Sequence, residues 1–145
     1  MDHEKFETAC ACIRVRRAAR AITKLYDDAL ADTGLKVTQF ALLCAIKRLG
    51  EAHISRLAEA TDLDRSTLGR NLQPLRESGL IGYDAGADQR AVVVSLTPAG
   101  SRAIARALPR WERTQAHVGK RLGRERTAEL LELLAQVEAL EGLPA

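Results

Sequence analysis

Polar side chains recur at helical spacing in the stretch LDRSTLGRNLQPLRESGL, which runs from Leu63 to Leu80. Hydroxyl, amide and guanidinium groups are the donors that read base edges in the major groove of duplex DNA. We expect Arg70 to contact guanine or a phosphate, and Ser66 and Thr67 to contact base or backbone oxygens; the alternative is a solvated surface. The full predicted DNA-binding set in this stretch is Arg65, Ser66, Thr67, Arg70, Asn71 and Gln73.

The opposite face of the same stretch is apolar. Leu68, Leu72 and Leu75 recur at positions i, i+4 and i+7, so they predict a helix with one face buried in a core. Asp64 precedes the first turn, where a carboxylate can accept from free backbone N–H groups. Gly79 stands where such a helix would end.

A shorter helix is predicted just upstream, over residues 54–63, and a compact link at residues 61–64 joins the two. This pairing predicts a helix-turn-helix unit. Pro74 conflicts with the second helix, because an interior proline removes a backbone donor and costs about 3 kcal/mol. We expect either a bend after the DNA-facing turns or a helix that ends earlier.

A hairpin is predicted downstream, from Ile81–Tyr83, a loop rich in Asp and Gly, and the β-branched run 91–96. In the loop, Arg90 is the expected minor-groove probe, because a guanidinium gains most from narrow A·T-rich grooves. Asp88, an anion, is expected to pair with an arginine and support the wing, or to be an ordinary turn residue. Thr97-Pro98 predicts an N-cap and the first position of another helix.

The region before this winged unit reads as two helices, one over about residues 5–31 and one over residues 40–49 that Thr38 and Gln39 open. The second is apolar nearly all round, so it belongs in a core. The free N–H groups of its first turn could accept a DNA phosphate, which adds Thr38 and Gln39 to the predicted DNA-binding residues.

Two further amphipathic helices are predicted at the end of the chain, over residues 98–121 and 124–140. Long helices at both chain ends are more than a minimal winged unit needs. We therefore predict that residues 1–34 and 98–145, the terminal helices, form a dimerisation region, and that residues 35–97, the winged head, bind DNA. The alternative is that the terminal helices complete one monomeric core.

Cys10, Cys12, Arg16 and Arg20 are the candidate effector or redox residues on the first helix. The arginines are either a solvated face or a means of holding a carboxylate. The two thiols, at i and i+2, point to different faces, so they do not readily pair or share a metal. They are candidates for apolar packing, thiol sensing or metal binding, in that order. Trp111, the sole tryptophan, could anchor an interface or line a pocket.

Composition narrows the class of protein. At 145 residues and a formal net charge of +3, the chain has the size of one domain and is only mildly basic. Its three cysteines do not form a secreted disulfide framework, and it lacks a signal peptide or a membrane-length apolar run, so we expect a cytoplasmic protein. The sequence contains no glycine-rich phosphate loop, nucleophile elbow, metal-ligand set or cofactor motif, so an enzyme is not expected.

The order of these parts resembles the MarR family of bacterial winged helix-turn-helix regulators over nearly the whole chain. The resemblance is carried by Thr38-Gln39-Phe40, Asp64 to Leu68, Leu75 to Leu80, Asp88-Gln89-Arg90 and Val94 to Gly100. It implies a mainly α fold with a β-hairpin wing, and a homodimer with interleaved terminal helices. It also implies a repressor of transcription that leaves DNA when a small phenolic, acyl or oxidant signal arrives.

The sequence therefore predicts a homodimeric repressor of double-stranded DNA that a small organic acid or phenolic effector releases from a pseudo-palindromic operator. The first alternative is a thiol-sensing repressor that uses Cys10 or Cys12. The second is a winged-helix module that binds protein and not DNA. Steep salt dependence would favour DNA, because binding to DNA releases counterions.

Overall fold

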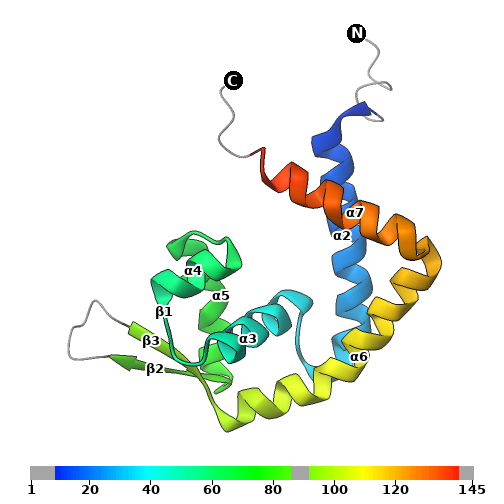
Figure 1. Ribbon diagram of the computed structural model, residues 1–145. Helices are drawn as coiled ribbons and strands as arrows, with labels where there is room; N and C mark the ends of the chain where they lie inside the picture. The colour runs from blue at the N-terminus through cyan, green and yellow to red at the C-terminus, as the bar shows by residue number, and fades with distance from the viewer. Residues whose placement is uncertain (1–8, 86–91, 141–145) are drawn as a thin grey trace. The chain divides into compact units, whose positions relative to one another are not determined.

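The computed structural model describes residues 9–85 and 92–140 (Figure 1). It is mainly helical with one small antiparallel sheet, which confirms the predicted fold class. The chain divides into two compact units, Met1–Trp111 and Glu112–Ala145. The elements are α2 (Ala11–Leu30), η1 (Ala31–Thr33), α3 (Val37–Leu49), β1 (Ala52–His53), α4 (Ile54–Thr61), α5 (Arg65–Glu77), β2 (Ile81–Ala85), β3 (Val92–Leu96), α6 (Pro98–Leu122) and α7 (Arg124–Glu138).

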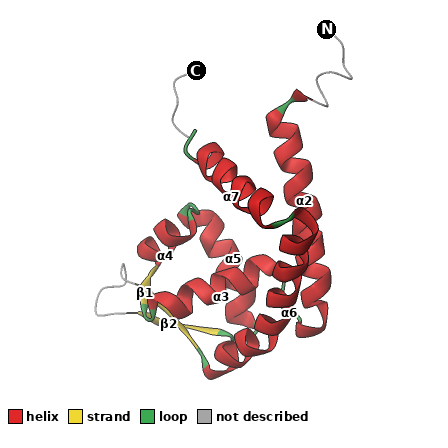
Figure 2. Cartoon of the chain, turned by 45° about the vertical axis from the view of Figure 1, so that its right-hand side comes forward, coloured by secondary structure: helices red, strands yellow, loops and turns green. Residues whose placement is uncertain are grey.

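The core of the first unit lies where α3, α4 and α5 gather beside the sheet (Figure 2). The leucines of the predicted apolar face of α5, Leu68, Leu72 and Leu75, are at most 1% exposed. They pack in one cluster with Leu43 and Ile46 of α3 and with residues of the neighbouring elements. Burying these branched side chains supplies the main driving force for folding of the winged head.

The sheet has three strands in the order β1-β3-β2. The predicted hairpin is present, with β2 and β3 paired antiparallel from Ile81↔Leu96 to Ala85↔Val92. The prediction of a hairpin alone was incomplete, because Ala52 and His53 form a third strand against Val94 and Val93. Two residues are too few to show the alternating pattern by which a strand is recognised.

Helix α5 begins and ends where the sequence predicts. The Asp64 carboxylate caps its first turn, and Gly79 follows the helix with a φ of +69°. The helix continues through Pro74 to Glu77, so of the two alternatives raised by the proline, the one in which the helix ends earlier is wrong. Leu72 and Leu75, on either side of the proline, are both fixed in the core, which offsets the lost backbone hydrogen bond.

The start of α6 is tied to the end of α5 through Thr97. The Thr97 hydroxyl accepts from the Gly100 N–H (3.0 Å) and donates to the Gly79 carbonyl (2.7 Å), and the Thr97 N–H donates to the Leu80 carbonyl (3.1 Å). This confirms the predicted cap. A Cβ added at Gly100 would lie 2.1 Å from the Leu80 carbonyl oxygen, so this close approach requires glycine.

Helix α3 starts at Val37, one residue before the predicted opening at Thr38. The cause is a contact from ten residues upstream, in which Asp27 Oδ1 of α2 accepts the Val37 N–H at 2.8 Å. The first predicted helix, over residues 5–31, is observed as α2 followed by the short helix η1, and residues 1–8 lie outside the described part. Arg110 of α6 binds Asp32 of η1 in a bidentate ion pair.

In the second unit, α6 ends at Leu122 and α7 follows after Gly123, whose φ is +88°. This confirms the predicted break. Helix α7 ends at Glu138, two residues short of the predicted Leu140. The described residues contain no single helix with the length and apolar character of a membrane span; α2 with η1 and α3, at a bend of 75°, meet that test only as a pair.

Candidate nucleic-acid interface

Helix α5 presents a polar face to solvent opposite its buried leucines. Arg65, Ser66, Arg70, Asn71 and Gln73 are exposed, while Thr67 is half-buried. These residues lie on the second helix of a helix-turn-helix unit, whose first helix is α4 and whose turn contains Asp62 in the left-handed region at φ +53°. The structure therefore brings the predicted donors of this helix onto one accessible element.

Two of these side chains, Thr67 and Arg70, form a hydrogen-bonded chain with the Asp64 cap at the start of α5. Asp64 Oδ1 accepts the Thr67 N–H and Asp64 Oδ2 accepts the Thr67 hydroxyl, both at 2.8 Å. Arg70 Nη2 donates to the same Thr67 hydroxyl oxygen at 3.4 Å. The backbone hydrogen bond from Thr67, followed by its hydroxyl, lowers the pKa of Asp64 below its ordinary value. Thr67 thus donates within the helix and helps to orient Arg70.

Gln73 lies three residues after Arg70 on α5, and its Nε2 donates to Glu77 Oε1 at 2.8 Å. In this arrangement its amide is held along the helix by an acidic neighbour. To hydrogen bond a base edge, Gln73 would exchange this partner for the base.

The first turn of α3 adjoins the middle of α5. Thr38 and Gln39 line a small hollow of about 150 Å³ together with Arg70 and Asn71. Lys36 adds a cation to the lining, and Leu42 and Pro74 complete it with apolar surface. Gln39 Oε1 accepts the Lys36 N–H at 2.9 Å, which closes the turn. Four of the predicted DNA-binding residues, drawn from two separate helices, therefore surround one site.

The wing is described only in part. Strands β2 and β3 are present, and Arg76 of α5 lies 4.6 Å from the centre of the Tyr83 ring, which fixes β2 against the recognition helix. Asp88 and Arg90, the predicted wing support and minor-groove probe, lie outside the described residues. Their roles remain predictions from the sequence.

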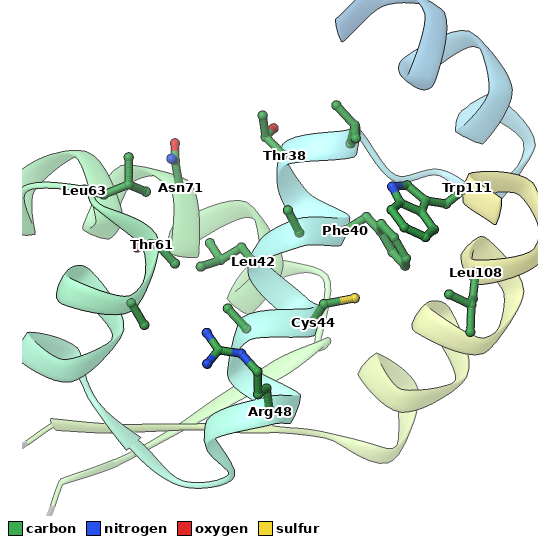
Figure 3. A pocket seen from close by; sticks show the side chains of 14 residues that line it. Thr38, Phe40, Leu42, Cys44, Arg48, Thr61, Leu63, Asn71, Leu108 and Trp111 are labelled. Carbon is green, nitrogen blue, oxygen red and sulfur yellow. The ribbon is translucent and has the colours of Figure 1, made fainter. Parts of the chain in front are cut away.

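A larger cleft of about 690 Å³ lies against α3 (Figure 3). Phe40 and Trp111 stand in its wall with ring centres 6.3 Å apart, and Thr61, Leu63 and Asn71 line it from α4, the turn after it and α5. Arg48 supplies a cation at the lower end of α3 in this view. Trp111 therefore lines a pocket, one of the two roles that the sequence left open. An apolar cleft with a few polar groups has the usual character of a small-molecule site.

Arg48 was missed by reasoning from the sequence. The sequence feature that could have identified Arg48 is a basic residue on a helix that is apolar nearly all round. This feature was not distinctive, because Lys47 and Arg48 together match the basic last turn that is common in helices. Cys44, on the helix that the sequence places in a core, is half-buried and also lines the cleft, where burial raises the pKa of its thiol.

The effector candidates on α2 and at its N-cap are not among the residues that line this cleft. Cys10 is half-buried and Cys12 exposed, both as free thiols, and Arg16 and Arg20 are exposed. Among residues 9–85 and 92–140, no group of three or more His, Cys, Asp or Glu side chains is arranged to hold a metal ion.

Comparison with known proteins places the chain in a family. The sequence pattern of the MarR family matches residues 33–91. The M. tuberculosis transcriptional regulator MosR, in a crystal structure with DNA, is 37% identical, with a TM-score of 0.79 over 91% of this chain and 98% of that protein. Bordetella bronchiseptica BpsR, 24% identical with a TM-score of 0.79 over 88% of this chain and 92% of its own, shares the fold.

Among curated proteins, the HTH-type transcriptional repressor NicR of Pseudomonas putida is 29% identical over 97 residues, or 66% of this chain. The matched part spans 61% of the length of NicR. These similar proteins are regulators and not enzymes, which confirms the prediction that this chain is no enzyme. The chain belongs to the MarR family of DNA-binding transcriptional regulators.

Proposed function

We propose that this protein is a homodimeric repressor of transcription that binds a pseudo-palindromic operator and leaves it when a small organic acid or phenolic effector binds. The observation that carries the DNA-binding part is the exposed polar face of α5 with the hollow beside it, where Arg70 and Asn71 meet Thr38 and Gln39. Guanidinium, amide and hydroxyl groups on one helix face suit the base edges of a major groove. Arg70 is assigned the central base contact.

The homodimer is supported by where the apolar surface lies. All the exposed large apolar side chains of residues 9–85 and 92–140 lie on the terminal helices or just after α7, and none on the winged head. They are Val15, Ile22, Leu25, Leu108, Leu122, Leu130, Leu131, Leu133, Val137 and Leu140. A second copy would cover this surface, and a two-fold dimer would match half-sites about one helical turn apart. On this basis residues 1–34 and 98–145 are assigned to dimerisation and residues 35–97 to DNA.

Repression is proposed from similar proteins, and release by an effector also from the cleft beside α3. NicR is a repressor, and the DNA binding of BpsR is regulated by 6-hydroxynicotinic acid, although BpsR resembles this chain at the level of fold. In this chain, the cleft beside α3 offers aromatic walls and the cation of Arg48, which suit a planar organic anion. An effector there would release DNA if it binds the DNA-free form more tightly than the DNA-bound form.

The test is a binding selection from bacterial genome fragments with the purified protein, run reduced, after mild peroxide treatment, and reduced with salicylate as a probe acid. An enriched palindrome in the reduced sample supports the repressor. Loss of that enrichment with salicylate supports the organic effector, whereas loss with peroxide alone would transfer the sensing role to Cys10 or Cys12. If no sequence is enriched in any sample, the operator-binding proposal is wrong.

A further inference from the structure

Lys36 lies beside the proposed DNA-binding face. It occupies the position before the first turn of α3 and lines the same hollow as Arg70, Asn71, Thr38 and Gln39. Its side chain is 69% exposed. A lysine ammonium on a long flexible stem is well suited to meet a phosphate as a point charge.

Asp27 of α2 controls the surroundings of Lys36. One carboxylate oxygen, Oδ1, accepts the Val37 N–H at 2.8 Å, and the other, Oδ2, lies 3.7 Å from Lys36 Nζ. The Asp27 side chain is only 20% exposed, so the hydrogen bond to α3 fixes its position. The carboxylate therefore has two separable roles, a structural one through Oδ1 and an electrostatic one through Oδ2.

We propose that Lys36 is a further phosphate-contacting residue, and that Asp27 is a positioning residue that holds its ammonium until DNA arrives. The inference rests on the proposed function, since it takes the hollow between α3 and α5 to face DNA. The Lys36 ammonium is largely in water and lies as far as 3.7 Å from the carboxylate, so this ion pair is weak and a phosphate can replace the carboxylate as partner of Lys36. Asp27 then competes with the DNA backbone, and its charge sets how tightly the first turn of α3 binds.

The test measures binding by fluorescence anisotropy across a salt series. Two duplexes of equal length are used, the sequence enriched in the selection and a mixed sequence, because phosphate contacts act on both. Lys36→Gln is expected to weaken binding to both duplexes and to reduce the salt slope by about one. An unchanged slope for Lys36→Gln would overturn the assignment of Lys36.

Asp27→Asn separates the two roles of the carboxylate. The asparagine oxygen can still accept the Val37 N–H, but the negative charge beside Lys36 is gone. Since the ammonium of Lys36 is exposed and the pair is correspondingly weak, affinity should rise by up to about fivefold. In the Lys36→Gln background, Asp27→Asn should give no increase, because the residue through which it acts is absent. An equal increase in both backgrounds would overturn the positioning role.

Asp28→Asn is the matched control for long-range charge. Asp28 neighbours Asp27 on α2 and pairs with Lys24 at 2.6 Å, with both side chains mostly exposed. The two substitutions change the net charge equally, but only Asp27 pairs with Lys36. Asp28→Asn should therefore raise affinity less than Asp27→Asn. Equal effects would mean that Asp27 acts only as a distant charge. Failure of the wild type to prefer the enriched duplex would count against the proposed function instead.

Discussion

The winged head buries its large apolar side chains, whereas the terminal helices leave many of theirs exposed. In the head, Leu43, Leu57, Leu68 and Leu72 are fully buried, and no large apolar side chain is exposed among its described residues. On α7, Leu131 and Leu133 are 59% and 58% exposed. The head has therefore completed its core within one chain, whereas the ends present an apolar surface of the kind that marks an interface. The effects of substitutions on the terminal helices should therefore depend on protein concentration, whereas the effects of substitutions in the head on folding should not.

The largest effect is expected from Leu131→Glu combined with Leu133→Glu. Each leucine occurs twice in a symmetric dimer, and fully burying one exposed leucine contributes about 1.5–3 kcal/mol. Because both are already partly buried in one chain, the double variant should lose about 3.5–7 kcal/mol of association free energy. Analytical ultracentrifugation should find a monomer where the wild type is a dimer. Glu132→Gln, between the two leucines, is the control and should leave the dimer intact. A double variant that stays as dimeric as wild type would exclude α7 from the interface.

The second comparison uses two glycines of the same helix, α6. Gly100→Ala forces a methyl group against the Leu80 backbone, so it should lower the free energy of unfolding by about 3 kcal/mol. Gly119 has open space around it, and Gly119→Ala should raise helix stability by about 0.5–1 kcal/mol. Chemical unfolding at several protein concentrations measures both. If Gly119→Ala instead weakens the dimer, the space at Gly119 is filled by a second chain.

The features that could be predicted from the sequence differ from the others in being local. The caps by Asp64 and Thr97 and the stops at Gly79 and Gly123 are local rules, and the structure confirms them. The strand at Ala52–His53 and the early start of α3 depend on partners ten or more residues away, so no local pattern contains them. The apolar face of α5 was readable because its period is regular.

The candidate site divides in the same way. The exposed donors of α5 follow from spacing, but the hollow that brings Arg70 and Asn71 beside Thr38 and Gln39 depends on how α3 and α5 pack. Arg48 and Trp111 are distant in sequence and share one cleft only in the folded chain. Residue type thus indicated what could bind, while packing decided which residues act together.

Within the head, Arg70→Ala should weaken DNA binding moderately and leave the fold of the head unchanged. Arg70 is exposed, so its loss should cost about 1–3 kcal/mol of binding to the enriched operator, with relaxed preference at one base pair. Anisotropy with operator variants measures this, and circular dichroism checks the fold. Arg113→Ala, an exposed arginine of α6, is the control and should bind like wild type. Equal operator protection by Arg70→Ala and wild type would mean that the recognition face is misassigned.

The smallest effect should come from the charge of the α5 cap. The Thr67 backbone N–H, and then the Thr67 hydroxyl, hold the pKa of Asp64 below its unfolded value. A group with a depressed pKa stabilises the fold above its unfolded pKa, and this contribution is lost as pH falls through the folded value. Asp64→Asn should therefore flatten the acid limb of a thermal stability profile slightly while leaving the neutral region nearly unchanged, because asparagine also caps well. Asp62→Asn is the control, because Asp62 is an exposed carboxylate that follows α4 and does not cap α5. An equal flattening in that variant would mean that the cap is not the cause.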